Sequence, residues 1–456
     1  MTTVRFRPEA LLVDGALQRG AALLVRDGAV VAEADGEVHD VAMPGRLLLP
    51  GFVNAHSHAF QRALRGRTEY RAPGHERDDF WSWREAMYQA ATTLSPEALY
   101  DVSRQCFLEL ALSGVTTVGE FHYLHHQADG TPYDDVQLLA KQVIAAARDV
   151  GLRIVLLRVG YARAGFQVAA NPRQRRFLDP DVDTFLSRTR ELQRATAGDA
   201  LVTVGLAPHS VRAVPLPWLK RVAAEWREGP LHMHVAEQPA ELAACVAEHG
   251  LTPVVLLERE GLLSPRFTGV HAIHLTDAEV AALGRAQANV CACPSTERNL
   301  GDGIVRADEL LAAGADVSLG TDSHAHTGML EEAQMLEGHL RLLRLRRNVL
   351  DAGDGVAARL VEALSHAGSR SLGLPPSALR PGERADFVTL DLTHPTLLGL
   401  DDLRALTCAP SAAVRDVVVA GRRIVTDGQH PAQRDIAERF ERALNPAGSL
   451  RASAPA

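Results

Sequence analysis

The stretch LVTVGLAPHSVRAVPLPWLKRVAAEWREGPLHMHVAE, residues 201–237, contains two short apolar runs separated by a longer stretch with helical periodicity. This alternation is typical of a βα unit in a parallel sheet. Six further apolar runs of the same kind lie before and after it, at 47–56, 115–121, 153–160, 267–274, 289–295 and 316–322. Eight such units in series predict an α/β fold, a (β/α)8 barrel of the TIM type.

The two ends of the chain differ from this middle part. Residues 1–50 consist of short apolar runs broken by DG and PG turns, and residues 376–430 repeat that style. Such runs are typical of short antiparallel strands. We therefore expect one small β domain assembled from both termini, a barrel over residues 51–375, and a helix and tail over residues 431–456.

Composition narrows the class of protein. The 456 residues are 46% hydrophobic and 23% charged, which is enough apolar material for a large core. A net charge of -8 repels polyanions, so we expect no nucleic-acid partner. No apolar stretch approaches the ~18 residues of a membrane span, and the five cysteines are too scattered for a disulfide framework. A cytoplasmic protein without a membrane anchor is expected.

Most of the eight runs end in His, Glu or Asp, at the barrel rim where catalytic groups collect. The HSH motif places His56 and His58 on one face of a strand, so both can reach one cation. The fifth run, LHMHVAE, supplies His232 and His234, two residues apart, while His271 closes the sixth run and Asp322 the eighth. Any one of these histidines could be an ordinary core residue, but the joint pattern favours a metal site.

Seven motifs carry a resemblance that spans nearly the whole chain. They are HSHAFQRALRG (56–66), FWSWREAMY (80–88), TTVGEFHYLHH (116–126), APHSVRAV (207–214), HMHVAEQ (232–238), STERNLGDGI (295–304) and GTDSH (320–324). Together they resemble the amidohydrolase superfamily of metal-dependent hydrolases and, within it, the formimidoylglutamate deiminases. The resemblance implies a barrel with a small β-sandwich built from both termini, and a homodimer.

The resemblance also implies the metal ligands, which would be His56, His58, His234 and Asp322. Three imidazoles and one carboxylate suit Zn²⁺ with a position left for water. Many superfamily members hold a second metal through a carboxylated lysine on the fourth strand. The fourth run of this chain, 201–208, has no lysine. One Zn²⁺ per chain is therefore expected.

Three residues are expected to move protons in the resembling family. Asp322 and His271 are both candidates to accept the proton of the attacking water, and the sequence does not apportion it between them. Glu237, three residues after His234, can deliver a proton to departing ammonia.

The substrate implied by the resemblance is N-formimidoyl-L-glutamate, an intermediate of histidine degradation with two carboxylates. Arg84 and Arg212 could each hold one carboxylate through a bidentate contact. Gln61, Tyr123 and His209 would add hydrogen bonds. The expected partner is thus a small dicarboxylate.

Two other features favour structural roles. We expect His122 near the site, but His125 and His126, in the same loop, in solvent. The CAC pair Cys291 and Cys293 lacks a second cysteine pair, so strand packing is expected there rather than a metal site.

Two alternative functions remain at this stage. One is a different aminohydrolase of the superfamily, acting on a purine or another heterocycle through the same metal. The other is a catalytically silent barrel retained for binding, but such a barrel would be expected to have lost ligands. Arginines at the rim favour the dicarboxylate over a ring.

Overall fold

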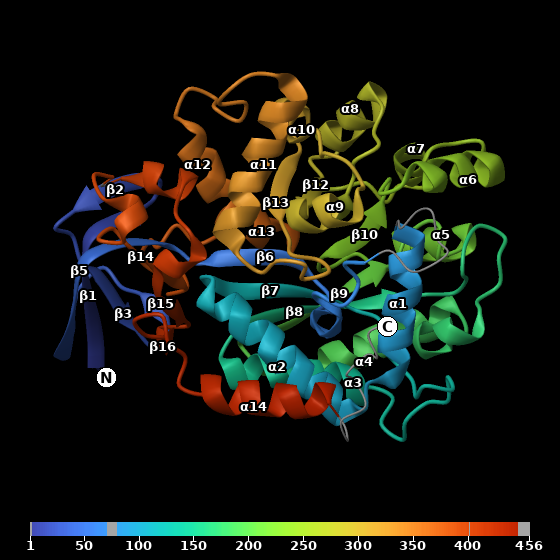
Figure 1. Cartoon of the computed structure of the whole chain (residues 1–456), viewed down its shortest axis with the longest axis horizontal. Coiled ribbons are helices and arrows are strands. Elements are labelled where there is room, and N and C mark those ends of the chain that lie inside the picture. Colours follow the sequence, from blue (N-terminus) through green and yellow to red (C-terminus); the bar gives the residue numbers. More distant parts are fainter. Residues whose placement is uncertain (1, 71–79, 401, 446–456) are drawn as a thin grey trace.

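The barrel dominates the computed structural model, which describes residues 2–70, 80–400 and 402–445. Its eight parallel strands, in the order of the chain, surround one axis (Figure 1). They are β6 (Phe52–Ser57), β7 (Val115–His122), β8 (Arg153–Gly160), β9 (Val202–Pro208), β10 (Leu231–Val235), β11 (Phe267–His271), β12 (Asn289–Ala292) and β13 (Asp316–Leu319). Each strand coincides with one of the eight apolar runs, so the predicted barrel is confirmed.

The first and last strands meet at their carboxyl ends. The carbonyl oxygen of His56 accepts hydrogen bonds from the backbone N–H groups of Thr321 and Asp322, both at 3.0 Å. The N–H of His58 donates to the carbonyl oxygen of Asp322 at 3.1 Å. These bonds close the barrel next to the predicted metal ligands.

Helices surround the barrel. The α-helices are α1 (Phe80–Thr93), α2 (Pro96–Leu112), α3 (Leu138–Val150), α4 (Val182–Thr196), α5 (Leu216–Glu225), α6 (Pro239–His249), α7 (Pro253–Arg259), α8 (Asp277–Arg285), α9 (Pro294–Leu300), α10 (Ala307–Ala313), α11 (Met329–Arg344), α12 (Val356–Val361), α13 (Ala367–Ser371) and α14 (Gln433–Leu444). The short helices are η1 (Ala59–Leu64), η2 (Pro172–Phe177), η3 (Glu362–His366), η4 (Pro395–Leu397), η5 (Leu403–Thr407) and η6 (Ser411–Ala413).

Local sequence signals account for several helix ends. Ser95 caps α2 by accepting a hydrogen bond from the N–H of Ala98. Helix α3 is followed by Gly151, whose φ of 90° is readily adopted by glycine because it has no Cβ. Within the described chain, no single helix is long and apolar enough to cross a membrane. The bent pair α6 and α7 passes that test by length and composition only when the two are taken together.

Helix α13 covers the bottom of the barrel, opposite the metal ligands. His232 of β10 bonds through Nε2 to the carbonyl oxygen of Ser371 at 2.7 Å, and Asn289 of β12 donates to the carbonyl oxygen of Ala367 at 3.3 Å. His232 therefore lies a layer below His234, and its polarity is used for packing rather than for the metal site.

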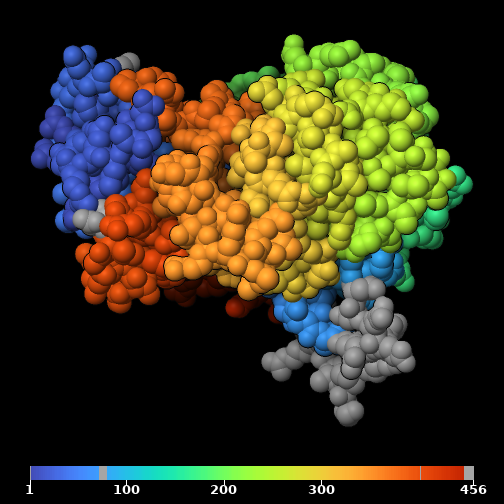
Figure 2. Space-filling model, turned by 90° about the horizontal axis from the view of Figure 1, so that it is seen from above, coloured from blue at the N-terminus to red at the C-terminus, as the bar shows by residue number. Residues whose placement is uncertain are grey.

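Segments near both ends of the chain form a second, mixed sheet beside the barrel, where blue atoms of the N-terminal segment adjoin orange to red atoms from later in the chain (Figure 2). Its strands are β1 (Thr2–Val13), β2 (Ala16–Arg19), β3 (Leu23–Arg26), β4 (Ala29–Val30), β5 (Glu37–Pro50), β14 (Phe387–Asp391), β15 (Val414–Val419) and β16 (Arg422–Val425). The expectation of only short antiparallel strands was wrong in part. β1 and β5 have 12 and 14 residues and pair in parallel, because the β2–β4 segment returns the chain to the start of β1.

A buried ion pair ties β8 to the segment that follows η2. Arg158 donates from both terminal nitrogens to the two carboxylate oxygens of Asp179, each at 2.8 Å. The two side chains are 2% and 0% exposed. Since η2 contributes to the wall of the pocket described below, this pair fixes part of that wall to the barrel.

We expect Asp179→Ala to lower the free energy of unfolding by about 3–5 kcal/mol, because it leaves the Arg158 charge buried without its main partner. Denaturant unfolding followed by far-UV circular dichroism measures this. The control is Glu438→Ala on α14, which removes a pair with the exposed Arg434 and should leave the midpoint unchanged. An unchanged midpoint for Asp179→Ala would contradict the prediction.

Candidate functional site

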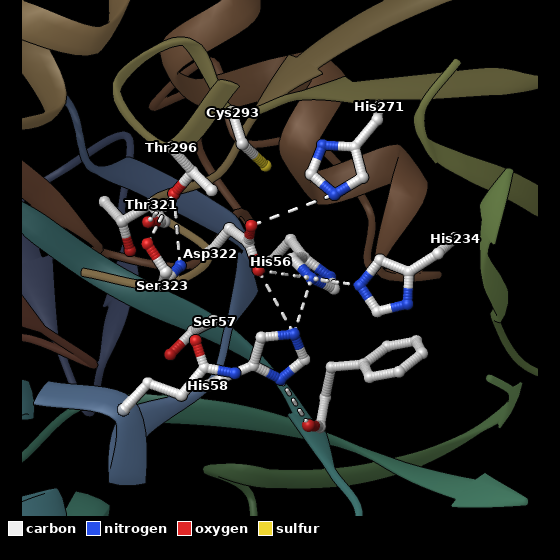
Figure 3. Close-up of polar contacts among 12 residues, drawn as sticks. His56, Ser57, His58, His234, His271, Cys293, Thr296, Thr321, Asp322 and Ser323 are labelled. Carbon is white, nitrogen blue, oxygen red and sulfur yellow. Dashed lines mark hydrogen bonds and ion pairs between the residues drawn. The ribbon is translucent and has the colours of Figure 1, made fainter. Parts of the chain in front are cut away.

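Four side chains converge at the carboxyl end of the barrel. His56 and His58 come from β6, His234 from β10, and Asp322 follows β13 (Figure 3). The Nε2 atom of His56 lies 3.2 Å from that of His58 and 3.1 Å from that of His234. Asp322 Oδ1 is 3.3 Å from His56 Nε2 and 3.1 Å from His58 Nε2. The structure thus brings together the four residues that the sequence predicts as metal ligands, and their geometry could hold a metal ion.

The protonation of these imidazoles favours a cation among them. His58 Nδ1 faces the carbonyl oxygen of Phe121 at 2.9 Å, and His234 Nδ1 faces that of His209 at 3.1 Å. In the neutral form of each ring, Nδ1 therefore carries the proton, and Nε2 is bare and directed at His56. Burial lowers the pKa of His56 to about 3, so the His56 ring is neutral. Lone pairs that face one another in this way, next to a carboxylate, fit a divalent metal ion.

Neither lysine of the chain lies at this site. Lys141 pairs with Asp135 at 2.6 Å and Lys220 of α5 pairs with Glu260 at 3.7 Å, and both lysine side chains are at least half exposed. β9, where a bridging lysine would stand, contains none.

His271 lies beside this quartet among carboxylates. Its Nε2 is 3.7 Å from Glu237 Oε1 and 3.8 Å from Asp322 Oδ2, while Nδ1 is 3.3 Å from Glu297 Oε1. Although burial acts in the opposite direction, the charges of Glu237, Glu297 and Asp322 raise the pKa of His271 well above its usual range. Glu237 and Asp322, the other two residues predicted to move protons, therefore both lie within reach of His271.

One pocket opens onto the quartet, with about 510 Å³ of empty space. All the predicted site residues except His56 line it, and His56 is fully buried beneath it. The predicted substrate contacts in its wall are Gln61, Arg84, Tyr123, His209 and Arg212. Gln61 donates from Nε2 to the Tyr123 hydroxyl at 2.8 Å.

The two arginines lie on separate elements but close together. The guanidinium carbons of Arg84 on α1 and Arg212 after β9 are 4.5 and 5.8 Å from the ring of Trp81. Arg84 Nε and two nitrogens of Arg212 are buried without a hydrogen-bond partner among the described residues. Burial lowers the pKa of Arg212, but Glu241 and Glu237 more than offset this, so its charge is retained. Unpartnered buried guanidinium groups are suited to bind an anion.

The structure adds site residues that the sequence reasoning missed. Glu297 accepts from the N–H of Cys293 at 2.8 Å as well as facing His271, which orients the ring. Tyr88 and Tyr161 line the pocket on the side of the arginines. The only signal for Glu297 and Tyr88 was their place inside quoted motifs, and Tyr161 had only its position after the third apolar run.

The expectation that His125 and His126 are in solvent was wrong. They are 5% and 7% exposed, and each bonds through Nε2 to a backbone carbonyl oxygen at 2.8 Å, that of Val159 and that of Leu178. The loop folds back over the barrel, so both imidazoles are buried and their Nε2 atoms must find hydrogen-bond partners inside the protein. Cys291 of β12 and Cys293, which directly follows that strand, are fully buried in an apolar cluster with Ala55 and Val270.

Comparison with known proteins agrees with this architecture. The sequence pattern of the amidohydrolase family matches residues 47–424. A formimidoylglutamate deiminase of Pseudomonas aeruginosa is 37% identical over 449 residues, covering 96% of this chain and 98% of that protein. An 8-oxoguanine deaminase of the same organism is 32% identical over 442 residues, 92% of this chain and 93% of that one.

A solved structure supports the same assignment. The crystal structure of an amidohydrolase from Brucella melitensis, 34% identical, superposes with a TM-score of 0.90 and covers 97% of this chain and 99% of that one. The two structures therefore share their fold over nearly the whole length of both chains. The chain belongs to the amidohydrolase family of hydrolytic enzymes.

Proposed function

We propose that this enzyme is a formimidoylglutamate deiminase, which hydrolyses N-formimidoyl-L-glutamate to N-formyl-L-glutamate and ammonia in histidine degradation. The observation that carries this proposal is the pair Arg84 and Arg212. Their unpartnered nitrogens are buried in the wall of the same pocket as the ligand quartet. A substrate with two carboxylates would supply the missing partners, and similarity to the P. aeruginosa enzyme supports the same substrate.

The metal we propose is one Zn²⁺ per chain, held by His56, His58, His234 and Asp322. Their ligand atoms all lie within 4.8 Å of one another. When bound, Zn²⁺ supplies Lewis acidity and makes water acidic enough to yield a nucleophile near neutral pH.

The chain's own residues would manage the protons. Asp322 Oδ2 can receive the proton of the water that attacks the amidine carbon, and His271 Nε2, 3.8 Å away, can receive it when its ring is neutral. Glu237 Oε1, 3.7 Å from His271 Nε2, can then pass a proton to the departing nitrogen. Glu297 holds His271 at Nδ1, which leaves Nε2 directed at this exchange.

A deaminase of a purine or other heterocycle is the second candidate. The similarity to an 8-oxoguanine deaminase and the aromatic residues of the pocket favour it. The buried nitrogens of Arg84 and Arg212 argue against it, because they lack hydrogen-bond partners among the described residues and a neutral ring supplies no carboxylate to accept from them. Release of ammonia from N-formimidoyl-L-glutamate, compared with a panel of purines and pyrimidines, separates the two candidates.

We further propose that the enzyme works in the cytoplasm as a homodimer, with a small dicarboxylate as its partner molecule. The net charge of -8 supports the absence of a nucleic-acid partner. Native mass in solution measures the oligomeric state.

The first prediction concerns the metal. Elemental analysis of zinc-replete protein should give about one equivalent per chain, because four ligands serve one ion and no lysine bridges a second. His234→Ala should lose this zinc, since it removes one of three imidazoles. Two equivalents, both required for turnover, would contradict a single-metal site.

The second prediction concerns Glu237. Glu237→Gln should keep the zinc but lower kcat roughly 10²-fold or more, the scale for losing a general acid or base. Steady-state ammonia release and metal analysis of the same sample measure both effects. Loss of the metal in this variant would mean that Glu237 is a ligand instead.

The third prediction concerns the arginines. Arg84→Met or Arg212→Met should lower kcat/KM for N-formimidoyl-L-glutamate by ~30- to ~800-fold, or about 2–4 kcal/mol, because each removes a charge-assisted contact with a carboxylate. Zinc content should stay at the parental level. Parental efficiency in both variants would place the dicarboxylate site elsewhere.

A further inference from the structure

Two buried tyrosines and one glutamine form a cluster in the pocket wall beside the arginines. Tyr88 comes from α1, Tyr161 follows β8, and Gln174 lies in η2; they are 1%, 2% and 0% exposed. Gln174 Nε2 lies 3.0 Å from each tyrosine hydroxyl oxygen, and the two oxygens are 3.3 Å apart. Both tyrosines line the pocket that holds the ligand quartet.

The direction of the Gln174 amide follows from its other contact. The backbone N–H of Asn171 donates to Gln174 Oε1 at 3.0 Å, in a capping box at the start of η2. A flipped amide would set two donors against each other there, so the NH₂ group must face the tyrosines. Gln174 therefore donates one proton to each hydroxyl.

The Gln174–Tyr88–Tyr161 cluster has one more hydrogen-bond donor than it has contacts. The cluster has two amide protons and two hydroxyl protons for three contacts, two from Gln174 and one between the tyrosines. The remaining O–H has no acceptor among the residues that the structure describes. Burial raises the pKa of Tyr161 well above its usual range, which keeps that hydroxyl protonated and able to donate. A buried donor without an acceptor is costly and calls for a partner from the pocket.

The surroundings define the chemistry of that partner. The guanidinium carbon of Arg84 lies 5.6 Å from the ring of Tyr88, and His209 packs against Tyr161 with ring centroids 4.7 Å apart. The positive charge of Arg212 also acts on the Tyr161 hydroxyl: it lowers the pKa of Tyr161, although burial outweighs this effect. An acceptor placed here would meet positive charge from both arginines, which favours an anionic oxygen over a neutral one.

We infer that the Tyr88–Tyr161 pair, held by Gln174, donates one hydrogen bond to a carboxylate of the bound dicarboxylate, next to Arg84 and Arg212. This inference rests on the proposed function for the identity of the substrate. The tyrosines act as binding residues that position the carboxylate end, and they do not touch the reacting amidine. Their loss should therefore raise KM and leave kcat within about threefold.

Phenylalanine variants test this inference, because the effect of the double variant should be much larger than the two single effects combined. In Tyr88→Phe or Tyr161→Phe the remaining hydroxyl no longer has a tyrosine to donate to, so it can serve the ligand in place of the lost one. Each single variant should stay within about threefold of the parent in kcat/KM, whereas the double variant should lose about ten- to a hundredfold, as for a lost hydrogen bond to a charged group.

Direct binding provides a readout independent of turnover. Glutarate, a dicarboxylate without an amidine, is titrated calorimetrically into the zinc-loaded parent and the double variant, and its affinity should fall about tenfold or more in the variant. The control is Tyr100→Phe, which removes a hydroxyl that donates to Asp149 outside the pocket and should leave glutarate affinity unchanged. The zinc content of the double variant should match that of the parent, whereas its melting temperature should fall, because the buried NH₂ group of Gln174 loses both of its acceptors.

The two proposals fail in different ways. A parent that binds glutarate but does not release ammonia from N-formimidoyl-L-glutamate overturns the proposed substrate and leaves the tyrosine contact standing. A double variant with parental glutarate affinity and parental KM overturns the tyrosine contact, whatever the substrate. Absence of glutarate binding by the parent overturns it as well.

Discussion

One backbone carbonyl oxygen, that of His56, accepts the N–H groups of both Thr321 and Asp322 and so closes the barrel. His56 belongs to the first barrel strand and Asp322 follows the last. Without this closure the carboxylate ligand would not reach the imidazoles of β6, because hundreds of residues of chain separate them and no local element holds them together. The same bonds that complete the sheet therefore assemble the candidate metal site.

This arrangement requires local strain and buried polarity, which the rest of the fold must hold in place. His271 and Asp322 have φ angles of 70° and 45°, and residues other than glycine adopt such angles only at a cost of about 1–3 kcal/mol. A network on the outer side of β6 braces the ligand backbone: Glu120 accepts from the Ser57 hydroxyl at 2.6 Å and from the N–H of Ala59 at 2.8 Å. Both contacts flank His58, so the strand cannot shift without breaking them. The imidazoles of the ligand quartet are therefore held face to face by the contacts with Glu120 and by the hydrogen bonds that close the barrel.

The sequence predicted those parts of the molecule that depend on short-range pattern. Each barrel strand is an apolar run, and a ligand such as His234 stands at the end of its run, so both could be found by reading along the chain. The parallel pairing of β1 with β5 could not, because it is set by which distant strands meet and not by their composition. Glu297 and Gln174 were missed for a similar reason. Their importance lies in bonds to His271 and to the two tyrosines, and nothing in their immediate sequence specifies those partners.

The site divides its tasks between two kinds of structure. The metal quartet and His271 stand on barrel strands or directly at their ends, where closure of the sheet fixes them. Arg84 and Tyr88 stand on α1, an element added between the first strand and the first barrel helix, and Gln174 stands on η2 in the connection after β8. Such connections can change in sequence without disturbing strand pairing or register. In this fold the metal quartet is therefore constrained by the sheet, whereas Arg84, Tyr88 and Gln174 stand on segments that the sheet does not constrain and that can differ between proteins that share the barrel.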